Sequence, residues 1–236
     1  MKAMILAAGL GTRLRPLTDD RPKALVEVAG RTLLEICLER LRGFGVDEVI
    51  VNTHHFAEMV EAYLKAHGNF GMRIEVSRED TLLDTGGGLK QAAWFFQEDG
   101  EDEPFVVHNV DVMSSIDLGE LVRFHHERGA LATVAVQERK SSRYLLFDED
   151  GLLCGRETEL VRPCGKTTAL AFAGIHVLSP RIFGDMTEVG AFSIISAYLR
   201  LVGAGEKVVA FRADGCAWRD LGRPESVAAA EREIEG

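Results

Sequence analysis

Two glycines, an arginine and a lysine lie close together near the N-terminus, in an order that suits an anion. Gly9 and Gly11 follow the apolar residues 3–7, and Arg13 and Lys23 come after them. Glycines at a strand end adopt positive φ, and their free N–H groups form an anion-binding concavity. Arg adds a planar fork for phosphate oxygens, and Lys adds a compact charge. The spacing fits a tight turn or a phosphate-binding loop, and the concentrated cations favour the loop.

Two common phosphate-binding motifs do not fit this stretch. The dinucleotide fingerprint needs a third glycine where the chain has Leu14. The Walker loop needs Gly-Lys-Ser/Thr at its end, and the stretch has no such sequence. Pro16 and Pro22 instead stiffen a longer loop that carries the cations.

Two aspartates are candidates for a metal site. Asp111 follows residues 104–110, a predicted strand that is mostly apolar, and a period of two places it on one face with Asn109. Open α/β sheets bind ligands at the carboxyl ends of their strands, where a carboxylate could hold Mg²⁺ or cap a turn. Asp220 lies in the sequence Trp-Arg-Asp-Leu-Gly. It is either a loop residue beside Arg219 or a second metal ligand.

A third candidate stretch is Asp-Thr-Gly-Gly-Gly, residues 84–88. Three glycines before a predicted helix offer bare N–H groups and room for a flat ligand. The alternative interpretation is a flexible loop.

Bulk composition excludes several classes of protein. The 236 residues are 46% hydrophobic and 27% charged, which is typical of a soluble globular protein. The net charge of −10 disfavours nucleic acid as a partner. No run of 18 apolar residues occurs, so no membrane span is expected. The N-terminal apolar run stops at Gly9 and predicts a buried strand rather than a signal peptide.

The four cysteines predict neither a zinc site nor a redox pair. Cys37, Cys154, Cys164 and Cys216 form no Cys-x-x-Cys pair and have no zinc-like spacing with histidine. We interpret them as reduced thiols of a cytoplasmic protein. No Ser-His-Asp set or nucleophilic cysteine stands out, and no protein partner is evident.

Alternating apolar and amphipathic stretches must position these residues. Strands are predicted at residues 3–7, 48–52, 73–76, 104–110, 131–137, 144–147, 169–178 and 207–212. Helices are predicted at residues 32–42, 57–66, 89–96, 118–128, 192–202 and 225–234. The βαβα order of the first half predicts an α/β fold, with a mostly parallel central sheet and helices on both faces. The second half is expected to add antiparallel strands to the same sheet.

The N-terminal stretch resembles the signature of the sugar-1-phosphate nucleotidyltransferases. The matching residues are Gly9, Gly11, Thr12, Arg13, Pro16, Thr18, Pro22, Lys23 and Leu25. The resemblance covers nearly the whole chain, so we expect one catalytic domain with a Rossmann-like nucleotidyltransferase fold over residues 1–236. It implies transfer of a nucleotidyl group from an NTP to a sugar 1-phosphate, with Mg²⁺ as cofactor, giving an NDP-sugar and pyrophosphate.

The resemblance also implies roles for individual residues. Arg13 and Lys23 are expected to bind the phosphates and, with Asp111, to be catalytic, while Asp111 and Asp220 are expected to hold Mg²⁺. The expected contacts to the nucleotide come from Ala8, Gly9, Gly11, Thr12, Arg13, Lys23, Thr85, Gly86 and Gly87. Asn109 and Gly174 are expected to face the sugar phosphate.

The chain departs from the family pattern at two places. Val110 replaces a glycine that often precedes the metal-binding aspartate, and the Glu-Lys-Pro motif before the strand at 169–178 is missing. The residue that binds the sugar phosphate is therefore left open, as are the nucleobase and the sugar. The favoured pair of substrates is UTP with N-acetylmuramate 1-phosphate, and their reaction would belong to cell-wall precursor metabolism. The alternatives are GTP with mannose 1-phosphate, a cytidylyltransferase for a phosphocholine-like group, and a catalytically inactive nucleotide sensor.

Overall fold

The strands and helices follow the order expected from the sequence. The computed structural model describes residues 1–98, 100 and 102–235. The strands are β1 (Lys2–Leu6), β2 (Glu27–Val28), β3 (Arg31–Thr32), β4 (Glu48–Thr53), β5 (Arg73–Arg78), β6 (Phe105–Asn109), β7 (Val112–Ser114), β8 (Ala132–Gln137), β9 (Tyr144–Phe147), β10 (Leu153–Arg156), β11 (Glu159–Leu160), β12 (Thr168–Leu178), β13 (Val208–Arg212) and β14 (Trp218–Asp220). The α-helices are α1 (Leu33–Gly43), α2 (Ala57–Ala66), α3 (Asp84–Gln91), α4 (Ala93–Gln97), α5 (Leu118–Arg128), α6 (Ile182–Asp185), α7 (Ile194–Gly203) and α8 (Pro224–Glu235). Among the described helices, none combines the length and the apolar character needed to cross a membrane.

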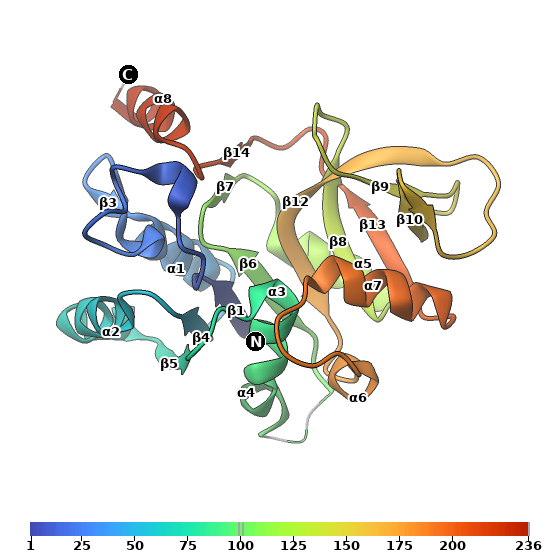
Figure 1. The fold of residues 1–236 in the computed structure, drawn as a ribbon, viewed down its shortest axis with the longest axis horizontal. Helices are drawn as coiled ribbons and strands as arrows, with labels where there is room; N and C mark the ends of the chain where they lie inside the picture. The colour runs from blue at the N-terminus through green and yellow to red at the C-terminus, as the bar shows by residue number, and fades with distance from the viewer. Residues whose placement is uncertain (99, 101, 236) are drawn as a thin grey trace.

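One sheet of ten described strands runs through the molecule (Figure 1). Its main path is β11-β10-β9-β12-β6-β1-β4-β5, and β8 pairs with both β12 and β13. Strands β6, β1, β4 and β5 are parallel, whereas β12 is antiparallel to β6, β8 and β9. The predicted α/β fold is confirmed, including the antiparallel strands that extend the sheet in the second half.

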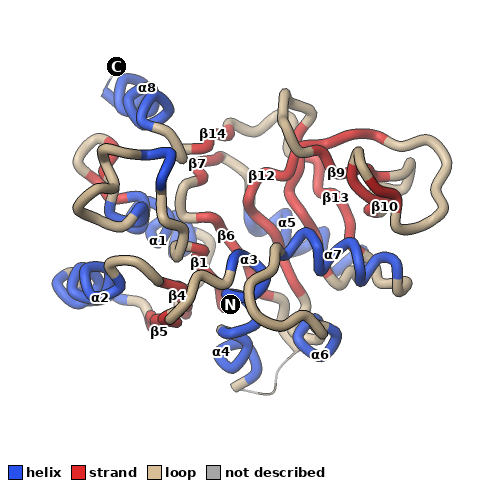
Figure 2. Tube along the Cα trace, viewed as in Figure 1, coloured by secondary structure: helices blue, strands red, loops and turns tan. Residues whose placement is uncertain are grey.

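Alternating residues of the central strands build two hydrophobic cores. On β1, Ala3 and Ile5 join the core beneath α1, α2, α5 and α8, whereas Met4 joins the core beneath α3, α4 and α7. Figure 2 shows helices on both sides of the strands. Each large apolar side chain that is fully buried stabilises the fold by about 1.5–3 kcal/mol relative to an exposed one. This double coverage explains why β1 is apolar from Ala3 to Leu6.

Local capping fixes where two of the helices begin. The Thr32 hydroxyl accepts a hydrogen bond from the Glu35 N–H at 3.1 Å, at the start of α1. Asp117 Oδ1 accepts one from the Glu120 N–H at 2.8 Å, at the start of α5. Such side-chain caps satisfy backbone donors that the first turn of a helix leaves unpaired.

Two predicted elements differ from the structure. The helix expected at residues 89–96 is two helices, α3 and α4, and the glycines at 86–88 lie inside α3 rather than before it. Glycine has a low intrinsic helix propensity, but tertiary packing overrides it here. The strand expected at 104–110 ends at Asn109, so Asp111 lies in the turn that follows rather than on the strand.

Three buried histidines make the fold sensitive to acid. Burial lowers the pKa of His108 and of His125 to about 4, and the pKa of His176 to about 3. The His125 ring contacts Thr133 Oγ1 at 2.9 Å and Ser179 Oγ at 3.0 Å. All three are therefore neutral in the folded protein at pH 7. In the unfolded chain the same groups take up protons near pH 6.5.

We predict that the free energy of unfolding falls as the pH drops from 7.5 to 5. In this range the unfolded state binds protons that the folded state cannot, at a loss of about 2 kcal/mol per histidine. The substitution His125→Gln should reduce the fall in the free energy of unfolding over this pH range by one histidine's contribution, about 2 kcal/mol. The matched control is His126→Gln, which changes an exposed residue of the same helix. Urea unfolding across this pH range tests the prediction, and parallel curves for the two variants would contradict it.

Candidate active site

The loop after β1 folds back on itself around Gly11. Gly11 has a φ of +64°, and the Thr18 hydroxyl donates a hydrogen bond to its carbonyl oxygen at 2.8 Å. An ideal Cβ on Gly11 would lie 2.9 Å from Thr18 Cγ2 and 3.2 Å from Lys23 Cβ. Only glycine fits this position, and the fold-back brings Lys23 next to the glycine loop. Gly9 is exposed, with open space around its Cα, so a ligand can reach the backbone there.

Four predicted site residues converge beside Gly222. The Lys23 ammonium forms an ion pair with Asp111 Oδ2. An ideal Cβ on Gly222 would lie 2.9 Å from Arg13 Nη2 and 3.2 Å from Asp111 Oδ2. The same point lies 2.7 Å from Asp220 Oδ1. The structure therefore joins three segments that are far apart in the sequence, and a side chain at position 222 would displace these charged groups.

The two-stranded ribbon of β7 and β14 places Asp220 next to Asp111. Asp220 lies opposite Val112 in the antiparallel register of β7 and β14. The Leu221 N–H donates to the Asp111 carbonyl oxygen at 2.7 Å, and the Gly222 N–H donates to Asp220 Oδ1 at 2.7 Å. The backbone thus holds residue 111 beside the ribbon and fixes the Asp220 carboxylate.

Burial makes the charges of this cluster interact strongly. The side chains of Lys23 and Asp111 are only 15% and 10% exposed. Two carboxylates held this close would repel each other without nearby cations, and Arg13 and Lys23 balance the charge. Removing one partner of a buried ion pair typically costs about 3–5 kcal/mol, because the other charge stays desolvated.

Asp111 and Asp220 are the residues that could hold a metal ion. Among the residues that the structure describes, no three His, Cys, Asp or Glu side chains gather into a complete metal site. Mg²⁺ does not need such a cage, since it commonly binds through one or two carboxylates together with water and substrate phosphates. The two aspartates, next to a loop suited to phosphate, fit this mode of binding.

The glycines of α3 serve close packing rather than an open surface. The N–H groups of Gly86 and Gly87 both point to the Phe192 carbonyl oxygen, at 2.9 and 3.3 Å. An ideal Cβ on Gly86 would lie 2.4 Å from the Phe192 ring, and one on Gly87 would lie 2.5 Å from the Gly190 carbonyl oxygen. The expectation of bare N–H groups at these two glycines is therefore wrong, because the segment before α7 already accepts their hydrogen bonds.

Thr85 has a structural partner as well. Its hydroxyl oxygen accepts a hydrogen bond from the Ile194 N–H at 3.0 Å. Contact of Thr85, Gly86 and Gly87 with a nucleobase stays a prediction, and this packing explains why the stretch is ordered as a helix.

Sequence reasoning missed a buried polar network that links the glycine loop to α3. Asn52 Oδ1 accepts hydrogen bonds from the N–H groups of Ala7 at 2.7 Å and Ala8 at 3.4 Å. Asn52 Nδ2 donates to Glu79 Oε1 at 2.7 Å, and Glu79 Oε2 accepts from the Leu83 N–H at 2.9 Å. The signal was available, because a polar residue at the end of an apolar strand lies at the ligand-binding edge of an α/β sheet.

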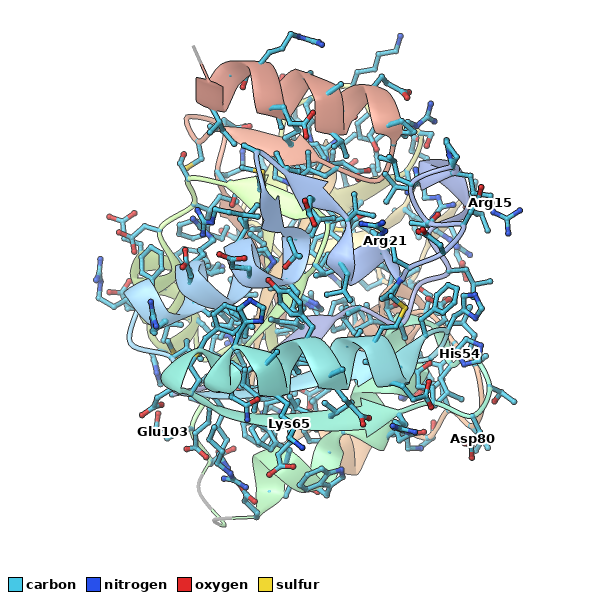
Figure 3. The ribbon with its side chains drawn as sticks, turned by 90° about the vertical axis from the view of Figure 1, so that its left-hand side faces the viewer. Arg15, Arg21, His54, Lys65, Asp80 and Glu103 are labelled. Carbon is cyan, nitrogen blue, oxygen red and sulfur yellow. The ribbon has the colours of Figure 1, made fainter. Side chains whose placement is uncertain are left out.

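Figure 3 shows the edge of the sheet to which this network belongs. Arg15, His54 and Asp80 lie together on one side of the molecule, where the loops after β1, β4 and β5 gather. Glu103, which precedes β6, lies on the opposite side. His54 Nδ1 contacts the Glu79 carbonyl oxygen at 2.8 Å, so this histidine joins two of the loops.

Asn109 and Gly174, the residues expected at the sugar phosphate, lie together. Gly174 interrupts β12 with a φ of +75°, and an ideal Cβ on it would lie 2.9 Å from Asn109 Nδ2. Strand β12 has an irregular register at this point, between Phe172 and His176. Glycine is needed here for the backbone conformation and for the close approach of Asn109.

We predict that Asn52→Leu lowers the free energy of unfolding by about 2–4 kcal/mol. The nearly isosteric change removes the hydrogen-bond partner of the buried Ala7 N–H and that of Glu79 Oε1, at about 1–3 kcal/mol each. The matched control is Thr53→Val on the same strand, because the buried Thr53 hydroxyl has no partner to lose. Urea unfolding measures the free energy of unfolding of both variants. Equal values would show that the Asn52 network does not stabilise the fold.

Comparison with known proteins identifies the family. Residues 2–236 match the family model described as nucleotidyl transferase. The chain is 37% identical to N-acetylmuramate alpha-1-phosphate uridylyltransferase of Caulobacter vibrioides, over 98% of this chain and 96% of that protein. It is 34% identical to the probable mannose-1-phosphate guanylyltransferase 3 of Oryza sativa subsp. japonica, over 95% of this chain, but spans only 62% of the length of that protein.

A solved structure supports the fold. The crystal structure of HddC from Yersinia pseudotuberculosis complexed with GMP-PN superposes with a TM-score of 0.80, at 22% identity, and covers 99% of both chains. The resemblance predicted from the N-terminal loop is confirmed by the family match. The chain belongs to the nucleotidyl transferase family.

Proposed function

We propose that this chain transfers a nucleotidyl group from an NTP to a sugar 1-phosphate, with UTP and N-acetylmuramate 1-phosphate as the preferred pair. The observation that carries the proposal is the convergence of Arg13, Lys23, Asp111 and Asp220 beside Gly222. The similarity to the uridylyltransferase of Caulobacter vibrioides, which extends over nearly the full length of both proteins, supports this choice of substrates.

The reaction needs positioning and charge compensation more than acid–base chemistry. A sugar phosphate is a dianion above its second pKa of about 6, so its oxygen can attack the NTP α-phosphate without a strong general base. The new P–O bond forms as the bond to pyrophosphate breaks, and pyrophosphate leaves with the electron pair. The protein must hold two anions together and stabilise the charge on the transferring group.

The cationic loop and the two aspartates divide this work. In the proposal, the backbone N–H groups of Gly9 and Gly11, with Arg13 and Lys23, bind the triphosphate. Asp111 and Asp220 hold Mg²⁺, which when bound neutralises phosphate charge and orients the oxygens. Lys23 pairs with Asp111 in the described structure, so its ammonium group lies beside a carboxylate that would hold the cation.

A second substrate pair follows from the comparisons. The similarity to a probable mannose-1-phosphate guanylyltransferase favours GTP with mannose 1-phosphate as the alternative. We also propose a cytoplasmic setting for either reaction, in keeping with the interpretation of Cys37, Cys154, Cys164 and Cys216 as reduced thiols.

Pyrophosphate release with Mg²⁺ tests the proposal directly. UTP, GTP, CTP and dTTP are each combined with the 1-phosphates of N-acetylmuramate, mannose, glucose and N-acetylglucosamine. We expect the highest kcat/KM for UTP with N-acetylmuramate 1-phosphate. Preference for GTP with mannose 1-phosphate would select the alternative. Absence of turnover from folded protein that still binds an NTP would refute the enzymatic proposal.

We predict that Asp111→Asn and Asp220→Asn each lower kcat/KM by at least about 100-fold, the scale on which charge stabilisation at a reacting phosphate acts. The matched control is Asp150→Asn, an exposed residue of the β9–β10 turn, which should retain wild-type activity. Urea unfolding confirms that each variant is folded. Chelation of Mg²⁺ should abolish turnover and added Mg²⁺ should restore it. Full activity of either site variant would remove that aspartate from the proposed metal site.

A further inference from the structure

Arg139 and Trp218 form a stacked pair beside the charged cluster. The Arg139 guanidinium carbon lies 3.6 Å from the centre of the Trp218 ring. Arg139 Nη2 donates to the Phe172 carbonyl oxygen at 2.8 Å, and Trp218 Nε1 donates to the Ala173 carbonyl oxygen at 2.7 Å. Consecutive carbonyl groups of β12 therefore hold the arginine and the tryptophan in place.

Arg139 is a partly buried cation that pairs with no carboxylate among the described residues. Other arginines of the second half, such as Arg162 and Arg212, form ion pairs with aspartates. Arg139 Nε is buried without an acceptor, and Nη1 makes no hydrogen bond within the described chain. Burial lowers the pKa of Arg139, and the charge of Asp220 opposes this effect. A desolvated guanidinium held this way is poised for an anion from outside the chain.

The position of the pair connects it to the expected sugar side of the site. Trp218 lies on β14 with Asp220, two residues away on the same strand. The carbonyl groups that hold the pair belong to the two residues just before Gly174, which packs against Asn109. Arg13 and Lys23 belong to the N-terminal loop, whereas Arg139 belongs to the segment after β8. The charge of Asp220 acts on Arg139 as well as lying beside Arg13.

We propose that Arg139, held flat on Trp218, binds an anionic group of the acceptor sugar 1-phosphate and thereby determines which acceptor is used. The inference rests on the proposed function. N-acetylmuramate 1-phosphate carries two groups of the right chemistry, the phosphate and the carboxylate of its lactyl ether. A guanidinium fork matches the oxygens of either group, and stacking on the indole fixes its plane.

The test compares two acceptors, N-acetylmuramate 1-phosphate and N-acetylglucosamine 1-phosphate, with UTP saturating. They differ by the lactyl ether, which carries the carboxylate. For Arg139→Gln we expect the KM for N-acetylmuramate 1-phosphate to rise about 10- to 100-fold, the effect of losing a charge-assisted hydrogen bond. The KM for UTP should stay within about twofold. Calorimetric titration of the acceptor into protein with a non-hydrolysable UTP analogue should show the same weakening.

The two acceptors separate the two anions. A rise in KM confined to N-acetylmuramate 1-phosphate assigns Arg139 to the carboxylate, and an equal rise for both acceptors assigns it to the phosphate. Arg143→Gln, which removes an exposed arginine of the same loop, is the matched control and should leave both KM values unchanged. Unchanged KM values in folded Arg139→Gln, alongside an active wild type, would overturn the inference.

Two further arrangements keep the test decisive. If Arg139→Gln does not fold, Arg139→Lys replaces it, because lysine keeps the charge and loses the planar fork. If the wild type uses mannose 1-phosphate instead, its phosphate is the single anion and the KM for that acceptor is the readout. Failure of the proposed function would appear separately, as a wild type that releases no pyrophosphate with any acceptor.

Discussion

The ion pair of Lys23 with Asp111, next to Arg13 and Asp220, is the constraint on which the rest of the structure depends. Two carboxylates share this space with an ion-paired lysine, and the Arg13 guanidinium lies beside them. The loop after β1 supplies the cations, the turn after β6 supplies Asp111, and the β7–β14 ribbon supplies Asp220. The adjacency of β1 and β6 in the sheet is what brings the first two segments together.

Strand β12 extends this arrangement into the second half of the molecule. It pairs antiparallel with β6, so its residues beside Gly174 lie at the same edge of the sheet as Asn109. The register of β12 against β8 is irregular between Phe172 and His176, and at this point the carbonyl groups of Phe172 and Ala173 hold Arg139 and Trp218. The same stretch of β12 therefore carries Gly174, which packs against Asn109, and supports the Arg139–Trp218 pair.

The parts that could be predicted from the sequence are those encoded by local pattern. The spacing of Gly9, Gly11, Arg13 and Lys23 was sufficient to predict a cationic loop after β1. The pattern of apolar residues was sufficient to predict most strands and helices. The remaining features depend on contacts between distant segments. The glycines of α3 are helical because Phe192 packs against them, and Asn52 meets Glu79 only once β4 and β5 are paired. No local pattern carries this information, nor the stacking of Arg139 on Trp218.

Val110, which replaces a glycine of the family pattern, is accommodated in the hydrophobic core. Its side chain is 2% exposed and joins the core that also contains Val106, while its N–H donates to the Leu6 carbonyl oxygen at 3.2 Å. The valine therefore faces the interior, and the next residue, Asp111, turns its carboxylate to Lys23. Valine in place of glycine adds apolar contact to the core. The charged cluster beside Gly222 still forms. Val110 and the missing Glu-Lys-Pro motif are the two departures that leave an inactive sensor as an alternative, and of these Val110 gives no structural reason for loss of catalysis.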